Sequence, residues 1–355
     1  MLIRKIIYLL VGFGLVITIL SSSQKENTFE ITDETTIWEM YAKLGKIELH
    51  KINTEVKGYS ATKGKELVHQ GWTTDPDGRK TKIQSKFFKC TACHNTVKEF
   101  ETMTDNNPNN RLAYAVKHEL PYLQGSTFFG IVNRKRFYNG DYQEKYGSVP
   151  DISVANYDLR KAIHVCATQC AQGRPLDDWE MESILAYFWQ LQLRVKDIEL
   201  SEAEKEKIEY ALNEERSSAR AVHLLEGKFL ESIPATFPKE ELAPVELTGK
   251  DLENTKSFQN GKAIYDLSCK HCHAGKRYSF YSLSDNIKDF KHLSNKAIKE
   301  GAYHSIYYIT RHGTYPLPGK RAYMPQYTIE KLTDQQIKDL HIYIKVMAEG
   351  RIVTN

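Results

Sequence analysis

The chain has 355 residues, which is long enough for two domains that each bury a core of their own. Charged residues make up 26% and hydrophobic residues 41% of the sequence, which is ordinary for a soluble globular protein. The formal net charge is only +4 and no run of lysine and arginine stands out, so we expect no nucleic-acid partner.

The N-terminus has the features of an export signal. Arg4 and Lys5 precede an apolar run from Ile6 to Leu20, and residues 21–24 are polar and form a cleavage zone. The run is shorter than the about 20 residues that a spanning helix needs, so we interpret residues 1–23 as a signal peptide. Cleavage of this segment and its retention as an inner-membrane anchor both stay open. No later segment is apolar enough to span a membrane, and we therefore expect an exported, periplasmic protein with no other integral membrane segment.

The first cysteine motif has the pattern C-x-x-C-H and contains Cys90, Cys93 and His94. This is the attachment pattern of c-type haem, in which two thiols bond to the porphyrin and the next histidine binds the iron. A thioredoxin-like site lacks the adjacent histidine, and a zinc site needs two cysteine pairs close in sequence. A disulfide framework is the remaining alternative in an exported chain. We predict that Cys90 and Cys93 hold a haem and that His94 is its proximal ligand.

A further pair of cysteines follows a long insertion over residues 95–157 that is rich in Tyr, Asn and Gly. Cys166 and Cys170 are four residues apart, so they share a face if the segment is helical. Cys166 is then a ligand or reactive sulfur, which would lower the potential of the haem; the alternatives are a disulfide with Cys170 across a local break, or two inert core thiols. We adopt Cys166 as an iron ligand. The fallback ligands are Met103, His118, His164 and Met181.

An amphipathic helix closes the first half. Asp177 and Glu180 can form a capping box at its start. The apolar residues expected on one face are Met181, Ile184, Leu185, Phe188 and Leu191. A charged helical segment then begins at Ser201, with a capping box to Glu204, and prolines at positions 234, 238 and 244 break its regularity.

The second half repeats the order of helix, cysteine motif and helix. The stretch from Gly261 to Leu267 leads into a second C-x-x-C-H motif. In it Cys269 and Cys272 are expected to hold a haem, with His273 as proximal ligand and His271 facing outward. Thr333 and Gln336 can cap the closing helix, whose apolar face contains Ile337, Leu340, Ile344 and Met347.

This order is the one that a small cytochrome c domain requires, because two helices cross and the loop between them wraps the haem. We therefore predict an all-α fold that is a tandem of two cytochrome c domains, with two covalently bound haem c groups. The first domain covers residues 35–200, a charged linker with helix and prolines covers residues 201–246, and the second domain covers residues 247–351.

Met324 is the candidate sixth ligand in the second domain. It precedes Pro325 and lies shortly before the capped closing helix. A thioether opposite the proximal histidine gives a His/Met haem and raises its reduction potential. The alternative is that Met324 is a core residue, in which case His304, His312 or Lys320 is the ligand.

The first half carries a more specific pattern, in which Gly64 opens a helix, C-x-x-C-H is followed by Asn95, and Cys166 precedes the run Gly-Arg-Pro-Leu that ends at Leu176. In this pattern the chain resembles the di-haem thiosulfate dehydrogenases, whose first domain is similar to the haem subunit of the sulfur-oxidising Sox system. The resemblance covers most of residues 58–350. It implies that a cysteine thiolate, by position Cys166, binds the active-site haem iron, where His94 is the proximal ligand. Two thiosulfate ions would couple there to tetrathionate with release of two electrons. The second haem, held by His273 and Met324, would pass electrons to an external acceptor such as another cytochrome c.

The chain departs from that family near the substrate pocket. The family tends to carry Arg-Ile-Asn-x-Cys, whereas here the run from Ala162 to Cys166 lacks the arginine, and Cys170 adds a thiol. Thiosulfate carries two negative charges, so cationic side chains must offset the repulsion between two such ions. The candidates are Arg134, Arg136, Arg160, Lys161 and Arg174. Of these, Arg160, Lys161 and Arg174 are predicted to act with Cys166; the alternative for each is a solvated surface charge, and for Arg174 also a partner of a haem propionate.

Two functions remain open. In the first, the protein oxidises thiosulfate to tetrathionate, or catalyses the reverse reaction, and Cys166 with the Gly-Arg-Pro-Leu run favours it. In the second, it is a pure electron-transfer cytochrome or subunit without a substrate of its own, which the missing arginine favours. A peroxidase-like di-haem enzyme is a third hypothesis.

Overall fold

The computed structural model describes residues 28–138, 140–150, 152–214, 218–240, 242–297, 305–314 and 323–351. The predicted signal peptide and the alternative ligands His304 and Lys320 lie outside these residues. The described part of the chain consists of helices and loops, with isolated bridges and no named β-strand, so the predicted all-α fold is confirmed. Within the same residues, no helix combines the length and the apolar character needed to cross a membrane.

The first half contains seven α-helices and four short 3-10 or π turns among the described residues. The α-helices are α2 Ile37–Lys43, α3 Ala61–Gln70, α4 Pro108–Lys117, α5 Gly140–Tyr146, α6 Ile152–Ala155, α7 Leu159–Val165 and α8 Asp178–Gln190. The turns are η1 Cys90–Ala92, η2 Ile131–Asn133, η3 Cys166–Cys170 and η4 Val195–Asp197.

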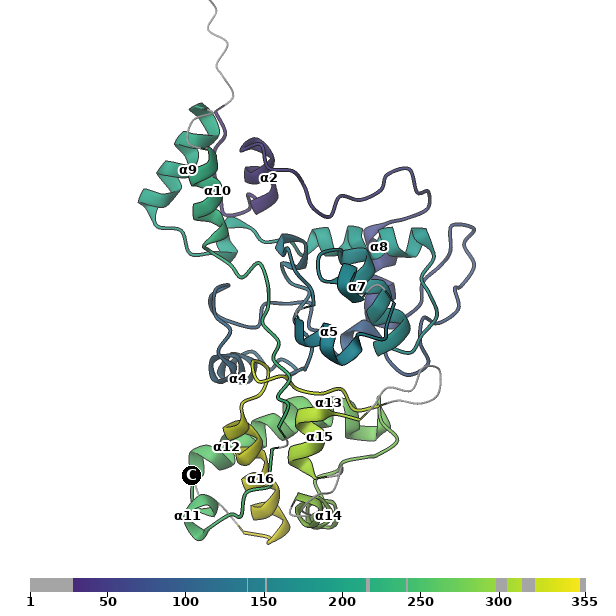
Figure 1. Ribbon diagram of the computed structural model, residues 1–355, viewed down its shortest axis with the longest axis vertical. Coiled ribbons are helices and arrows are strands. Elements are labelled where there is room, and N and C mark those ends of the chain that lie inside the picture. Colours follow the sequence, from purple (N-terminus) through teal and green to yellow (C-terminus); the bar gives the residue numbers. More distant parts are fainter. Residues whose placement is uncertain are drawn as a thin grey trace, which may run out of the picture.

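Two helices then connect the halves, and the second half follows. The connecting helices are α9 Glu202–Glu214 and α10 Ser218–Glu226. The helices of the second half are α11 Gly249–Leu252, α12 Thr255–Ile264, α13 Lys270–His273, α14 Ile287–Ala297, α15 Ile306–His312 and α16 Asp334–Ala348, with the turns η5 Tyr265–Cys269 and η6 Ala274–Lys276. The halves follow one another along the long axis of the molecule (Figure 1).

The two halves use the same helix crossing. In the first half α3 packs on α8, and in the second α12 packs on α16. A glycine lies at each crossing: a Cβ atom on Gly64 would come within 1.8 Å of the Ser183 carbonyl oxygen, and one on Gly261 within 2.0 Å of the Asp339 carbonyl oxygen. Such contact between backbones is open only to glycine. Gly64 and Gly261, each followed by a lysine in the sequence, therefore mark equivalent positions in two similar helix pairs.

Both closing helices begin as their sequences predict. The capping box between Asp177 and Glu180 starts α8, and the one between Thr333 and Gln336 starts α16. On α8 the predicted face is buried at Ile184, Leu185 and Phe188, Leu191 packs partly against it, and Met181 is half-buried. On α16 the buried face contains Ile337, Leu340 and Ile344, with Met347 packed partly against it.

Residues 201–246, predicted as a linker, are partly a component of the first core. Ile208 and Leu212 of α9 and Leu225 of α10 are buried in the same cluster as Trp38 of α2. In Figure 1, α9 and α10 stand beside α2 at the end of the molecule distant from α16. The charged faces of α9 and α10 concealed this role in the sequence, because few apolar positions are enough to fix a short helix on a neighbour.

The insertion of the first half also crosses the predicted domain boundary. Leu112 and Ala115 of α4, and Tyr122 after it, are buried in the cluster that α12 and α16 form. The Tyr122 amide donates to the carbonyl of Leu267 at 2.9 Å, and its hydroxyl donates to Gln336 at 3.3 Å. The two halves are therefore held together through a shared core and not only through the connecting helices.

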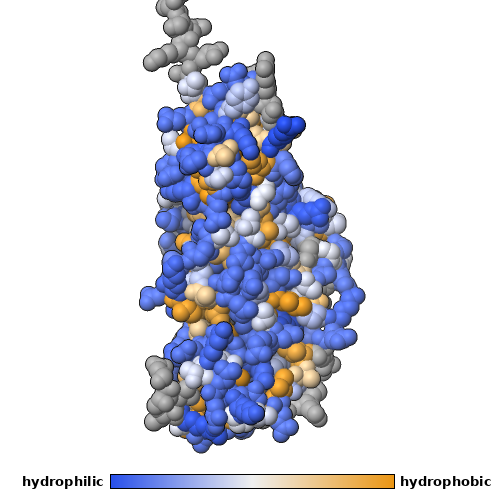
Figure 2. Space-filling view, turned by 90° about the vertical axis from the view of Figure 1, so that its left-hand side faces the viewer, coloured by the Kyte–Doolittle hydropathy of each residue, from blue (hydrophilic) through white to orange (hydrophobic). Residues whose placement is uncertain are grey.

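The surface gives no sign of a membrane-facing belt on the side that can be viewed. Figure 2 shows a mostly hydrophilic face on which hydrophobic side chains form small, separate patches. Scattered apolar residues of this kind are normal on a protein surface.

Candidate functional site

The first C-x-x-C-H motif forms a tight turn that starts at η1. The amides of Cys93 and His94 donate to the Cys90 carbonyl oxygen at 3.2 and 3.1 Å. His94 Nδ1 donates to the Ser126 carbonyl at 2.7 Å, and the ring stacks on Phe128 with centroids 4.5 Å apart. This fixes the tautomer and leaves Nε2 with the lone pair that a metal needs. Burial lowers the pKa of His94, which favours the neutral ligand.

The second motif repeats this arrangement. Cys269 ends the π turn η5, and α13 carries the remaining residues of the motif. His273 Nδ1 donates to the Tyr281 carbonyl at 2.9 Å, so its Nε2 is again the atom available to a metal. Burial raises the pKa of Cys269 to about 12 and that of Cys272 to about 11. These thiols lie in apolar surroundings, as covalent attachment to a porphyrin edge requires.

Each motif opens into its own cavity. The first cavity is lined by Cys90, Cys93 and His94 together with Cys166 and Cys170. The second cavity is lined by Cys269, Cys272 and His273. The residues that line both cavities are Phe88, Gln124, Thr314, Tyr323, Met324 and Pro325. Because one wall serves both cavities, groups bound in them would be immediate neighbours.

The two motifs also meet directly. His271, predicted to face outward, is instead half-buried, packs on Tyr278 with ring centroids 5.8 Å apart, and hydrogen-bonds to the backbone of Thr91 inside the first motif. Burial lowers its pKa, and the bond to Thr91 opposes that effect. The variable residues of one motif therefore contact those of the other, a relationship that neither motif alone could reveal.

Cys166 and Cys170 lie on a π turn, not on a regular α-helix. The Ala171 amide donates to the Cys166 carbonyl at 2.8 Å, five residues back, which is the π-helical pattern. The turn brings the two thiols into hydrogen-bond contact, and this contact, followed by burial, raises the pKa of Cys166. Both sulfurs face the cavity of the first motif. Of the four fallback ligands, none is among the residues that line this cavity.

The predicted cationic residues are placed elsewhere. Arg160 pairs with Glu182 at 2.7 Å and Arg174 with Glu180 at 2.6 Å, and both glutamates are buried near the start of α8. Neither arginine lines the first cavity, and Lys161 does not line it either. The lysines and arginines that do line it are Lys89, Arg134, Arg136 and Lys331, of which Arg136 is exposed and Lys89 half-buried.

Met324 is held by a short, specific loop. Its amide donates to Thr314 Oγ1 at 2.8 Å, and its carbonyl accepts from the Thr314 amide at 2.8 Å. Gly313 has a φ of +65°, and a Cβ atom there would lie 2.4 Å from the Met324 carbonyl oxygen. Met324 lines the second cavity, which His273 also lines, and it lines the first cavity as well. His312, the alternative ligand, lines the first cavity.

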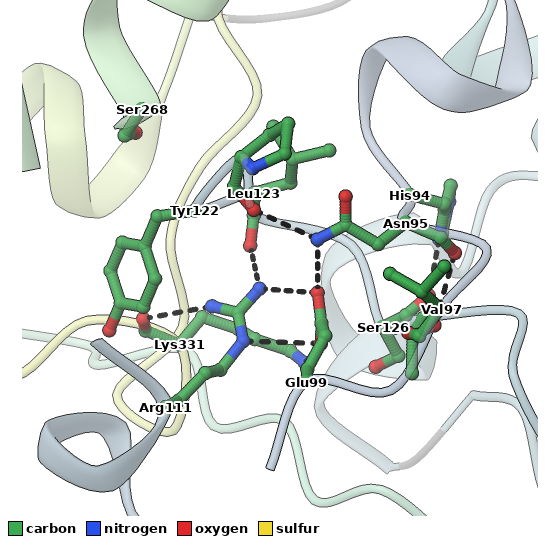
Figure 3. Close-up of polar contacts among 12 residues, drawn as sticks. His94, Asn95, Val97, Glu99, Arg111, Tyr122, Leu123, Ser126, Ser268 and Lys331 are labelled. Carbon is green, nitrogen blue, oxygen red and sulfur yellow. Dashed lines mark hydrogen bonds and ion pairs between the residues drawn. The ribbon is translucent and has the colours of Figure 1, made fainter. Parts of the chain in front are cut away.

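A buried polar cluster joins residues of the first half of the chain to Lys331 of the second half (Figure 3). Arg111 donates to both oxygens of Glu99, at 2.9 and 3.2 Å, and Asn95 donates to Glu99 at 2.7 Å. Lys331 Nζ lies 3.9 Å from Glu99 Oε2, and the Lys331 carbonyl accepts from Arg111 at 3.4 Å. The sequence did not predict this cluster, because Arg111 and Lys331 are 220 residues apart and neither belongs to a motif.

These features fit covalently attached haem at both motifs. Each motif supplies two thiols, an oriented imidazole and an apolar cavity, and each cavity has a sulfur-bearing residue in its wall. In the first cavity, the backbone of Gly125 packs closely against the motif. Its amide donates to the Cys93 carbonyl at 2.9 Å, and a Cβ atom at position 125 would lie 2.6 Å from the His94 ring.

A comparison with known families agrees for the second half. Residues 258–348 match the cytochrome c family model, a range that begins inside α12, contains the second motif and Met324, and ends with α16. The match supports a cytochrome c domain over these residues, which implies covalently bound haem c there and supports a role in electron transfer. No curated protein and no solved structure matches the chain.

Proposed function

We propose that the protein is an exported, periplasmic di-haem c-type cytochrome that oxidises a small anionic sulfur compound at the first cavity. Electrons would leave through the second cavity to an external redox partner, such as another cytochrome c. From the resemblance, the reaction is the coupling of thiosulfate to tetrathionate, or its reverse. The first half, which no family model covers, is in this proposal a second cytochrome c domain.

One observation carries the proposal. Cys166 lines the same cavity as Cys90, Cys93 and His94, although it lies far from them in the sequence. A thiol in the haem cavity of a pure electron carrier has no evident use. In the proposed enzyme it supplies a sulfur ligand that lowers the potential of the first haem.

Each residue has a separate task in this proposal. Cys90 and Cys93 would anchor the first haem, and His94, oriented by Ser126, would hold its iron. Cys166, which lines the same cavity, would supply a sulfur ligand to this haem. When bound, the two haems supply acceptors for one electron each, which matches the two electrons released as two thiosulfate ions form one sulfur–sulfur bond.

A negatively charged substrate needs a cationic side chain that it can reach from solution. Arg160 and Arg174 are predicted to act here, but their guanidinium groups are engaged by Glu182 and Glu180. Arg136 is exposed, lines the first cavity and lies 5.2 Å from the Tyr157 ring. Arg136 is therefore the stronger candidate for the first contact with a sulfur oxyanion.

The ion pairs of Arg160 and Arg174 also favour a second function. If Arg160 and Arg174 serve only the fold, the chain acts as an electron-transfer cytochrome or subunit without a substrate. The wall common to both cavities suits that function equally well.

An optical experiment separates the two functions. Purified, oxidised protein is mixed with thiosulfate without oxygen, the haem α-band is recorded, and tetrathionate is assayed. Rapid reduction with one tetrathionate for every two electrons supports the enzyme. If dithionite reduces the protein and thiosulfate does not, the electron-transfer function replaces it; tetrathionate added to reduced protein tests the reverse reaction.

A further inference from the structure

Two buried cations from different halves of the chain face the first cavity. Arg134 follows η2 in the first half, and Lys331 precedes α16 in the second. Each is only 5% exposed, and both line the cavity of the first motif. Buried arginine and lysine side chains are rare unless an anion pairs with them.

The described protein groups around them supply little negative charge. Arg134 donates to the neutral carbonyl oxygens of Thr127 and Phe129, at 2.9 Å each. Lys331 has Glu99 as its nearest carboxylate, at 3.9 Å, beyond hydrogen-bond distance.

That carboxylate is already engaged. Arg111 donates to both oxygens of Glu99, and Asn95 donates to one of them. The side chain of Glu330, next to Lys331, accepts from the backbone and hydroxyl of Thr236. Three cations, Arg111, Arg134 and Lys331, therefore surround one buried carboxylate.

Such an excess of buried positive charge costs free energy unless a further anion balances it. Burial, together with the charges of Arg111 and Arg134, lowers the pKa of Lys331 to about 7, although Glu99 and Glu330 act to raise it. Burial lowers the pKa of Arg134 to about 10. Two buried cationic side chains that lack a close carboxylate partner therefore line the first cavity.

We propose that Arg134 and Lys331 bind the carboxylate groups of the haem in the first cavity, so that the second half of the chain completes the haem site of the first. This inference rests on the proposed haem at Cys90 and Cys93. A sulfur oxyanion is also negatively charged, so the same two cationic side chains would bind it by the same chemistry. The haem carboxylates are favoured because both cations are nearly fully buried, whereas the exposed Arg136 is where a diffusing anion arrives.

The test begins with haem content, measured on the full-length protein as covalent haem per chain. Two haems per chain establish the cofactor on which the inference rests, and one haem per chain removes the proposed function before the inference is tested. The midpoint potential of each haem is then followed by electron paramagnetic resonance, which separates the two irons by their ligands.

The variants are Lys331→Met, which removes the charge, Lys331→Arg, which keeps it, and Lys345→Gln as a control. Lys345 is in the same half, on α16, and pairs with Glu349. Loss of a cation near the porphyrin favours the ferric iron, so Lys331→Met is expected to lower the potential of the first haem and leave the second unchanged. Lys331→Arg and Lys345→Gln should keep both potentials near those of the unaltered protein.

Two results would overturn the inference. The first is an unchanged potential of the first haem in Lys331→Met; if the spectral response to thiosulfate is lost as well, Lys331 is assigned to the substrate. The second is an equal shift of both haems, which indicates a general change of structure.

If the Lys331→Met protein does not fold, a second measurement tests the inference without it. Redox-difference infrared spectra are recorded for the unaltered protein and Lys331→Arg, each with ¹³C-labelled haem carboxylates. Carboxylate bands that differ between the two proteins support contact with residue 331. Identical bands show that residue 331 does not touch the haem carboxylates.

Discussion

Gly261 of α12 lies directly on the main chain of Asp339 in α16, so that a Cβ atom at position 261 would come within 2.0 Å of the Asp339 carbonyl oxygen. The first half has the same relationship at Gly64 and Ser183. The two helix pairs that frame the cavities therefore depend on backbone contact at one point each. Each helix pair also supplies residues that line the cavity of its half.

Gly261→Ala is expected to destabilise the second half strongly. The added methyl group must push α12 away from α16, because the contact is with backbone that cannot turn aside, and we expect a loss of about 3 kcal/mol in the free energy of unfolding. Urea unfolding followed by circular dichroism measures it. Gly249→Ala is the matched control: a Cβ atom there has nothing within 4 Å and should leave stability nearly unchanged.

Glu99→Gln is expected to lower the free energy of unfolding more than most substitutions of polar residues. Glu99 and Arg111 are 3% and 1% exposed at their side chains, and a neutral amide at position 99 would leave the neighbouring cations without a carboxylate. Loss of one partner from a buried ion pair costs about 3–5 kcal/mol. The comparison is Glu101→Gln, whose pair with Lys117 is 63% exposed on both sides and should matter little. Equal unfolding free energies for the two variants would contradict this role.

The Glu99 carboxylate should also make the free energy of unfolding decrease in acid. Although burial raises it, Arg111 and Lys331 hold the pKa of Glu99 at about 2, below the ordinary value of 4.5. The unfolded chain therefore binds a proton that the folded chain does not, so the stabilising contribution is complete above about pH 5 and is lost as the pH falls toward 2. Unfolding free energies measured across this range should decline less steeply in Glu99→Gln than in the unaltered protein.

Local rules predicted much of the fold from the sequence. The capping boxes at Asp177 and Thr333 start their helices as expected, and the helical fold is confirmed. Both C-x-x-C-H motifs form turns with an oriented imidazole, because residues adjacent in the sequence supply most of that geometry.

The arrangement between distant segments could not be predicted in this way. Lys331 belongs to the second half but lines the first cavity, and α4 belongs to the first half but packs in the second core. Nothing in the sequence around either segment differs from that of a surface loop or helix. Arg160 and Arg174 were chosen for their charge, and only the fold shows that Glu182 and Glu180 engage them.

Met324→Ala is expected to lower the potential of the second haem. A thioether ligand stabilises ferrous iron, so its removal favours the ferric state. Spectroelectrochemical titration should show one transition moved to lower potential and, because Met324 also lines the first cavity, a smaller change in the other. Leu242→Ala, in a partly buried residue of the second core, is the control for general loosening. A larger shift of the first haem would assign Met324 to that iron.

Cys166→Ser and Cys170→Ser are expected to separate the roles of two thiols that touch each other. If Cys166 is the iron ligand, Cys166→Ser should raise the potential of the first haem, remove its thiolate signature in the ferric spectrum and abolish thiosulfate oxidation. Cys170→Ser keeps a hydroxyl beside Cys166 but removes the second sulfur, so the ferric thiolate signature should persist if Cys166 supplies it. Spectra and turnover are recorded for both variants with haem content matched. If Cys170→Ser loses the signature and Cys166→Ser keeps it, Cys170 is the functional sulfur.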